Sequence, residues 1–206
     1  MLELFIEGQV YEVLLVTKSN VTPVGVVRRG ERLFFKLFGG RSAEDIREYP
    51  FAAVQVTNDA ELLARLGLNL GVRLEFEERG EYRWIRGLPG VYGRVSFLES
   101  IHEDELGKSP VLECSLTPEG TVSGKLPPKP LSRADFLLIE MAIDLTRLAV
   151  AVERGKFSVA QRLKGRIEEH YKLYTRLGGR SETAEAILQR TRLLTEGRFT
   201  DRKESL

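Results

Sequence analysis

Short apolar runs rich in β-branched and aromatic residues dominate the first part of the chain, up to about residue 125. Gly, Pro and Asn interrupt these runs at intervals of roughly 8 to 12 residues, a spacing that predicts a β-barrel or β-sandwich. The predicted strands lie near 2–6, 10–17, 24–28, 32–38, 51–57, 72–77, 92–101 and 110–117.

Two short helices are predicted between these strands. Ser42 and Asp45 have the spacing of a capping box, so the first helix is expected to begin at Ser42 and to end before Pro50. The second helix is expected to be capped by Asp59 and to end at Gly67.

The pattern changes to a helical period after the segment TVSGKLPPKPLS, whose prolines cannot donate ladder hydrogen bonds. We therefore predict two domains, 1–127 and 128–206. Ser132 and Asp135 resemble a second capping box, and the helix that follows to about Val152 is apolar around most of its circumference, as a buried helix is.

Two amphipathic helices are predicted beyond it, one over 158–177 and one from Ser181 to about Gly197. The fold class expected from the whole pattern is α+β, with a mostly antiparallel barrel followed by a C-terminal helical bundle.

Charge and composition indicate a soluble cytoplasmic protein. The 31 Lys and Arg nearly cancel the 30 Asp and Glu, so no strong field attracts nucleic acid or membrane. No run approaches the roughly 18 apolar residues of a membrane span, and the acidic start is unlike a secretory signal. Few Cys and Met with abundant Arg and Glu are typical of a thermophile.

Residues 12–49 contain the features best suited to a phosphorylated ligand. Thr17, Ser19 and Asn20 form a polar strand end, and Lys36 lies in an otherwise apolar strand. The sequence Gly39-Gly40-Arg41 leads into the helix expected at Ser42, and a helix N-terminus presents N–H groups that bind phosphate. The same residues also fit an ordinary turn before a helix and a lysine that points outward from a strand.

The order of these pieces resembles the DUF447 family of FMN-binding split-barrel proteins. The match includes the Thr-x-Ser-Asn strand end, Pro23-Val24-Gly25-Val26, the strand with Lys36, and the Gly-Gly-Arg-Ser turn. Four later segments also look like family blocks in the same order: VQVTND at 54–59, GVYGRVSFLES at 90–100, RADFLLIEMAIDLTRL at 133–148 and EEHYKLYTRLGGRSETAEAIL at 168–188.

This resemblance implies a six-stranded FMN-binding split barrel that forms a homodimer, with one FMN near the interface of each subunit. It further implies that the early strands and the Gly-Arg-Ser turn hold the phosphate, while the backbone at Val24 and Val26 flanks the flavin ring. The candidate cofactor-binding residues are Thr17, Ser19, Asn20, Val24, Gly25, Val26, Lys36, Gly40, Arg41 and Ser42.

The chain departs from the family pattern at two places. The hairpin between Lys18 and Pro23 is short, and Ala43 stands where the family carries a hydroxyl. Each lost hydrogen bond to a phosphate would cost about 1–3 kcal/mol, or roughly tenfold in affinity. Besides an FMN-dependent oxidoreductase, the alternatives are therefore a dimeric scaffold that has lost or weakly holds its cofactor, and an oxidoreductase that binds the deazaflavin F420.

No catalytic residue and no metal site is predicted. His102 and His170 lack the spacing of metal ligands, and Cys114 in an alternating strand is interpreted as a core residue. Tyr82 and Trp84 suit either stacking on a flavin or a dimer contact. The basic run 156–180 is interpreted as a solvated helix face rather than a nucleic-acid site.

Overall fold

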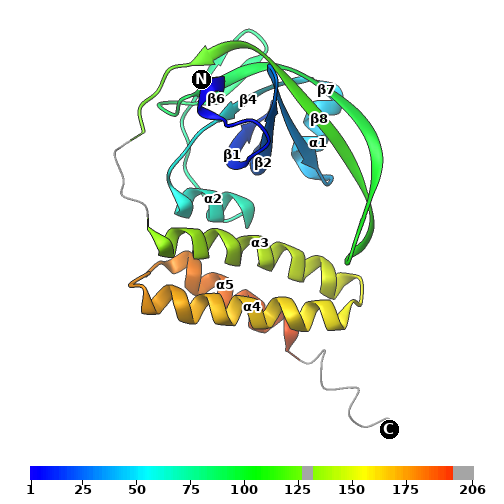
Figure 1. The fold of residues 1–206 in the computed structure, drawn as a ribbon, viewed down its shortest axis with the longest axis vertical. Helices are drawn as coiled ribbons and strands as arrows, with labels where there is room; N and C mark the ends of the chain where they lie inside the picture. The colour runs from blue at the N-terminus through cyan, green and yellow to red at the C-terminus, as the bar shows by residue number, and fades with distance from the viewer. Residues whose placement is uncertain (127–131, 197–206) are drawn as a thin grey trace. The chain divides into compact units, whose positions relative to one another are not determined.

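The computed structural model describes residues 1–126 and 132–196 of the chain, which divides into two compact units. Unit 1 contains a closed barrel of six strands in the order β1-β2-β3-β8-β7-β4 (Figure 1). The strands are β1 (Val10–Val16), β2 (Val21–Arg29), β3 (Arg32–Leu37), β4 (Phe51–Gln55), β7 (Gly90–Asp104) and β8 (Gly107–Val122). The predicted α+β class, with a barrel followed by helices, is confirmed.

Alternating apolar side chains form the interior of the barrel. Antiparallel pairing of β1 with β2 places Val10 opposite Val27 and Val16 opposite Val21. Side chains from every barrel strand meet in one cluster, which includes Val13, Leu15, Val24, Val26, Leu33, Phe35, Leu37, Val54, Val95, Leu112, Cys114 and Leu116. Cys114 is thus a packed core residue, and burial raises the pKa of its thiol to about 12.

The first predicted strand is wrong, because Leu2–Leu4 form a short 3-10 helix, η1. The carbonyl oxygens of Leu2 and Phe5 accept hydrogen bonds from the Arg28 guanidinium, at 3.2 and 3.4 Å, instead of pairing with a strand. Phe5 is buried and meets the Tyr11 ring edge-on at 5.3 Å. Local side-chain contacts therefore replaced the strand that the apolar pattern suggested.

A small separate hairpin was only partly predicted. Strand β5 (Phe76–Arg79) begins four residues later than expected, and its partner β6 (Tyr82–Ile85) was missed. Gly80 supplies the positive φ of +59° that the tight turn between the two strands requires.

Helix α1 (Gly40–Glu48) begins two residues before the predicted start, and Ser42 is not its cap. The N-cap is Gly39 with a φ of +82°, and no side chain caps the helix there. The expected capping box at Ser42 is therefore wrong, and both Ser42 and Asp45 are used elsewhere.

Unit 2 is assembled from three separate stretches of the chain. They are residues 60–70 with helix α2 (Ala60–Gly67), the turn at 104–107, and the C-terminal segment with α3 (Arg133–Glu153), α4 (Phe157–Arg176) and α5 (Glu182–Thr195). Buried residues from all three stretches share one core, among them Ala64, Leu68, Leu106, Leu138, Met141, Leu148, Leu163, Ile167 and Ile187. The predicted boundary between 127 and 128 lies outside the described residues.

The three C-terminal helices have the predicted positions to within a few residues. Ser181 caps α5, since its hydroxyl accepts from the Ala184 N–H at 3.0 Å. Ser132 is at the N-cap of α3 but makes no side-chain capping bond. In the described parts of the chain, no helix has the length and apolar character needed to cross a membrane.

The turn at 104–107 is held in unit 2 by charge as well as by burial. The Glu105 carboxylate pairs with Arg147 at 3.1 Å and also with Arg162. The Arg154 guanidinium donates to the Leu106 carbonyl at 3.1 Å, while the Leu106 side chain is buried. The turn is therefore an integral part of this unit.

Candidate functional site

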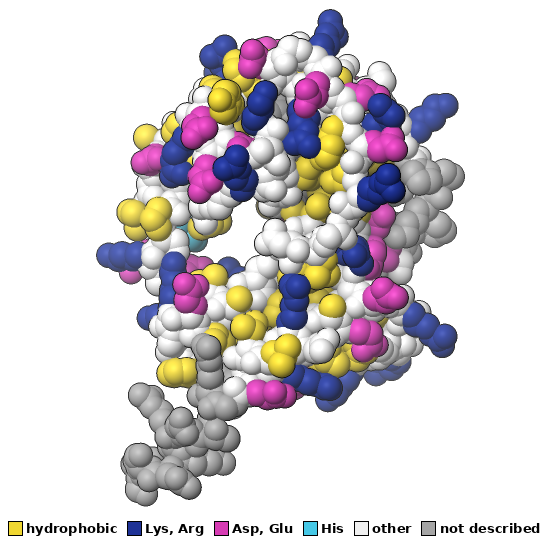
Figure 2. Space-filling model, turned by 180° about the vertical axis from the view of Figure 1, so that it is seen from behind, with side chains coloured by type: hydrophobic (Ala, Val, Ile, Leu, Met, Phe, Trp, Pro, Cys, Tyr) yellow, Lys and Arg dark blue, Asp and Glu magenta, His cyan; other side chains and the backbone are white. Residues whose placement is uncertain are grey.

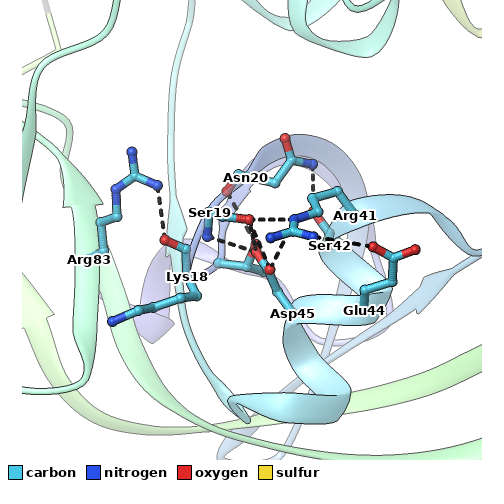
Figure 3. A network of polar contacts seen from close by, with 9 residues as sticks. Lys18, Ser19, Asn20, Arg41, Ser42, Glu44, Asp45 and Arg83 are labelled. Carbon is cyan, nitrogen blue, oxygen red and sulfur yellow. Dashed lines mark hydrogen bonds and ion pairs between the residues drawn. The ribbon is translucent and has the colours of Figure 1, made fainter.

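The predicted polar strand end and the start of α1 do come together. Thr17 and Asn20 close the turn between β1 and β2, since the Thr17 N–H donates to the Asn20 carbonyl at 2.9 Å. Figure 3 shows this turn facing the first turns of α1. We call residues 17–20 together with residues 40–45 the polar corner.

The carboxylate of Asp45 is the centre of the polar corner (Figure 3). It accepts the Thr17 hydroxyl at 2.7 Å, the Ser19 backbone N–H at 2.7 Å and the Ser19 hydroxyl at 2.9 Å. Its side chain is only 5% exposed. Burial alone raises the pKa of Asp45, but the hydrogen bonds from Thr17 and Ser19 and the nearby Arg41 charge outweigh it and hold the pKa below its ordinary value.

Arg41 and Asn20 complete the network. The Arg41 Nε donates to the Ser19 hydroxyl oxygen at 2.7 Å and lies 3.5 Å from Asp45, while another of its nitrogens lies 3.6 Å from Glu44. The Asn20 amide donates to the Ser42 hydroxyl oxygen at 3.0 Å. Arg41 is well exposed, whereas Ser42 is buried.

Counting donors shows which groups a phosphate could still use. Thr17 has one hydroxyl hydrogen, and Asp45 accepts it; Ser19 donates both its N–H and its hydroxyl to the same carboxylate. The Ser42 hydroxyl only accepts in this network, Arg41 has further N–H groups, and the first N–H groups of α1 lack a capping side chain. The available donors are therefore at the start of α1, together with the second N–H of the Asn20 amide.

The remaining candidates lie elsewhere on the barrel. Val24 and Val26 point into the core, so only their backbone could reach a ligand. Gly25 and Lys36 are on the outer face, where they line a cavity of about 840 Å³. The ten candidates therefore divide into the polar corner, the barrel interior and this outer cavity.

The outer cavity has largely apolar walls with a few charged groups. Phe34, Phe38, Phe97 and Leu98 are among its lining residues, and the last three are exposed. The Lys36 ammonium lies 3.5 Å from the Glu113 carboxylate at the same cavity. Lys36 is thus on the solvent side of its strand, as the simpler interpretation of the sequence expected, and it also lines this cavity.

Sequence reasoning missed the role of Asp45 and the contribution of the small hairpin. Asp45 was interpreted as part of a helix cap with Ser42, and no spacing in the sequence connected it to Thr17 and Ser19, which are 28 and 26 residues earlier. Arg83 of β6 donates to the Lys18 carbonyl at 3.1 Å beside the polar corner. No sequence pattern indicated that contact.

The hairpin aromatics Tyr82 and Trp84 pack mainly on the barrel. Trp84 stacks on Tyr92 with ring centroids 5.5 Å apart, and Tyr82 meets Phe51 edge-on at 5.5 Å. Burial and a hydrogen bond to Glu119 raise the pKa of Tyr82 to about 12. These contacts explain the aromatic residues without a ligand.

Metal ligands and charged surface patches were sought in the parts of the chain that the structure describes. Among the residues that the structure describes, no three His, Cys, Asp or Glu side chains are grouped as metal ligands would be. Basic and acidic side chains alternate over the face drawn in Figure 2. That face therefore has no continuous basic patch of the kind that binds nucleic acid.

The closed six-stranded antiparallel barrel, the polar corner and the following helices define an α+β split-barrel protein. The chain belongs to the DUF447 family. The family model described as "Protein of unknown function (DUF447) N-terminal domain" matches residues 11–123, and that described as "Protein of unknown function (DUF447)" matches residues 132–190.

Two solved structures are similar to this chain. One is an FMN-bound protein of family DUF447 from Methanosarcina mazei, with 20% identity and a TM-score of 0.66, covering 94% of this chain and 100% of that one. The other is nitrilotriacetate monooxygenase component B from Mycobacterium thermoresistibile, with 15% identity and a TM-score of 0.38, covering 59% and 71%. No protein with a curated description matches the sequence.

The Asp45 network predicts a loss of stability in acid. Because the folded-state pKa of Asp45 is lower than the unfolded value, its contribution is complete above about pH 4 to 5 and is lost as the pH falls through the folded-state pKa. Asp45→Asn is expected to lower the free energy of unfolding by about 2 kcal/mol at pH 7. Denaturant titrations should show this difference shrinking below pH 4; a constant difference down to pH 2 would contradict the assignment.

Proposed function

We propose that this protein is an FMN-binding flavoprotein whose phosphate site is the start of α1 in the polar corner. The observation that carries the proposal is the uncapped N-terminus of α1, with Gly39 and Gly40 in positive-φ conformations and Arg41 beside it. Glycine lets a ligand come close to the backbone N–H groups, whose dipoles favour an anion. Membership of a family with an FMN-bound structure supports the same ligand.

The residues present fit FMN in part. The backbone N–H groups of Gly40, Arg41 and Ser42, the Arg41 guanidinium and the Asn20 amide are the groups we assign to the phosphate. Thr17 and Ser19 are left out because Asp45 uses their hydrogens. Lys36 and Gly25 are assigned to the flavin ring through the outer cavity, and the backbone at Val24 and Val26 to its edge.

Bound FMN supplies redox chemistry, and the protein supplies position and electrostatics. We propose electron or hydride transfer as the reaction class. The exposed apolar residues at the outer cavity support a homodimer that covers the ring, because Val10 is 68% and Leu98 66% exposed there.

Arg41→Ala tests the phosphate assignment. It is expected to weaken FMN binding by about 10- to 100-fold, because a charge-assisted hydrogen bond to the phosphate is lost, and to leave riboflavin binding unchanged. Quenching of flavin fluorescence measures both affinities. Arg47→Ala is the matched control, since Arg47 is in the same helix but pairs with Glu99 at 2.8 Å. Equal effects of the two variants would contradict the assignment.

A dimeric scaffold without its cofactor is the second candidate, and the Asp45 network favours it. Two of the hydroxyl groups expected to hold phosphate are already satisfied inside the protein. Purified protein that is colourless and shows no rise in melting temperature with FMN or F420 would support this alternative. A yellow protein whose released chromophore has the mass of FMN would exclude it.

A further inference from the structure

The centre of the polar corner carries the same sign of charge as the ligand proposed for it. The Asp45 carboxylate is nearly enclosed, and its Oδ2 alone accepts from the Thr17 hydroxyl and from the N–H and hydroxyl of Ser19. The Ser19 hydroxyl is also 2.9 Å from Oδ1, so three donors, two hydroxyl groups and one backbone N–H, converge on this carboxylate as they could on a phosphate. The protein therefore holds an anion of its own in that place.

We infer that Asp45 is a specificity-determining residue of the flavin site: its carboxylate occupies the position of a phosphoryl oxygen at Thr17 and Ser19 and weakens the preference for phosphorylated over unphosphorylated flavin. This inference rests on the proposed FMN binding. Asp45 is not among the cofactor-binding residues predicted from the sequence, and its expected effect on phosphate binding is opposite to that of Arg41.

Electrostatics gives the direction of the effect. Arg41 is shared between Asp45 at 3.5 Å and Glu44 at 3.6 Å, so much of its positive charge is already compensated. A phosphate at the start of α1 is repelled by the Asp45 charge at short range, because the Asp45 carboxylate is nearly enclosed and is itself little screened by water. Riboflavin carries no phosphate and is unaffected by this repulsion. The charge therefore acts on the ratio of the two affinities.

A purely structural role for Asp45 makes a different prediction. If the carboxylate only fastens the turn at 17–20 to α1, removing it loosens the whole corner. FMN would then bind more weakly, and the preference for FMN, defined as the riboflavin dissociation constant divided by the FMN dissociation constant, would fall or stay constant. A rise in this preference for FMN thus indicates the specificity role of Asp45, and a fall or no change indicates the structural role.

The test compares FMN and riboflavin binding to the full chain and to Asp45→Asn by fluorescence quenching at pH 7. The variant is expected to increase the preference for FMN over riboflavin roughly tenfold, with a lower melting temperature. Glu44→Gln is the matched control, because it removes a charge from the same helix that also pairs with Arg41 but touches neither Thr17 nor Ser19. Its side chain is 60% exposed, so we expect a change of less than about twofold.

Thr17→Val keeps the test decisive if Asp45→Asn does not fold. In our inference the Thr17 hydroxyl donates to Asp45 and not to the phosphate. The preference for FMN over riboflavin is therefore expected to stay within about twofold of that of the unaltered chain. A roughly tenfold fall in the preference for FMN would overturn the inference, because Thr17 would then bind the phosphate itself. The inference would also be overturned if the preference for FMN fell in Asp45→Asn, or if it rose no more than in Glu44→Gln.

The same measurements distinguish this failure from failure of the proposed function. If the unaltered chain binds FMN and Asp45→Asn shows no gain, only the role of Asp45 is overturned. If neither the unaltered chain nor any folded variant quenches FMN fluorescence, the flavin assignment is overturned and the inference with it.

Discussion

Replacing Gly93 with alanine is expected to destabilise the barrel by about 3 kcal/mol or more. Gly93 is in β7 opposite Ala52 of β4, and a Cβ atom there would lie 2.0 Å from the Thr117 carbonyl oxygen and 2.8 Å from its carbonyl carbon. Both atoms belong to the backbone of β8, so no side-chain rotation relieves the contact. Either strand must shift, and that shift breaks pairing in the closed sheet.

Gly165→Ala is the matched control for Gly93→Ala. Gly165 is inside α4, and a Cβ atom there would have no atom within 4 Å. Alanine is therefore expected to stabilise the protein by about 0.5–1 kcal/mol, because it restricts the unfolded chain and favours the helix. Urea denaturation of both variants checks the pair. If both variants changed the free energy of unfolding by a similar amount in the same direction, the barrel would be shown to accommodate a Cβ atom at position 93 beside the Thr117 carbonyl group.

Gln55→Leu is expected to cost about 3–5 kcal/mol. Gln55 is fully buried in β4, where its amide donates to the carbonyl oxygens of Ile85 at 2.9 Å and Leu88 at 2.7 Å and accepts from the Ile85 N–H at 2.6 Å. Leucine leaves these three backbone groups without partners, and each unsatisfied buried group costs about 1–3 kcal/mol. Denaturant titration measures the loss, and hydrogen exchange should accelerate at the Ile85 amide.

Gln9→Leu makes the same chemical change at an exposed position. The Gln9 side chain accepts only from the Tyr11 hydroxyl, at 3.0 Å. Because water can replace that partner, the variant is expected to change stability by less than about 0.5 kcal/mol. If Gln55→Leu were equally mild, the amide would not be fastening the β5–β6 hairpin to the barrel.

The barrel could be predicted from sequence because its strands contact one another on a repeating inward pattern. Leu33, Phe35 and Leu37 alternate with outward residues, and all three are in the core as the period of two requires. The apolar run at 2–6 could not be assigned in the same way, because such a run forms a strand only where another strand is free to pair with it. Here Arg28 takes the backbone oxygens instead.

The sequence predicted that the two segments of the polar corner meet, but not the hydrogen bonds between them. The chain order of Thr17, Ser19 and Gly40-Arg41 suggested that strand end and helix start would meet, and they do. The sequence does not show which way a helical side chain faces in the folded barrel. In the structure the Asp45 side chain faces the β1–β2 turn, and its carboxylate accepts the hydrogens of Thr17 and Ser19 that a phosphate was expected to accept.

The three-part assembly of unit 2 limits how this protein can be dissected. A fragment that ended at residue 127 would keep α2 and the turn at 104–107 but would lack α3, α4 and α5. Ala64, Leu68 and Leu106 would then be without the helices that share their core. A fragment that began at residue 132 would in turn lack these three residues, so cutting the chain between residues 127 and 132 divides one hydrophobic core between two fragments.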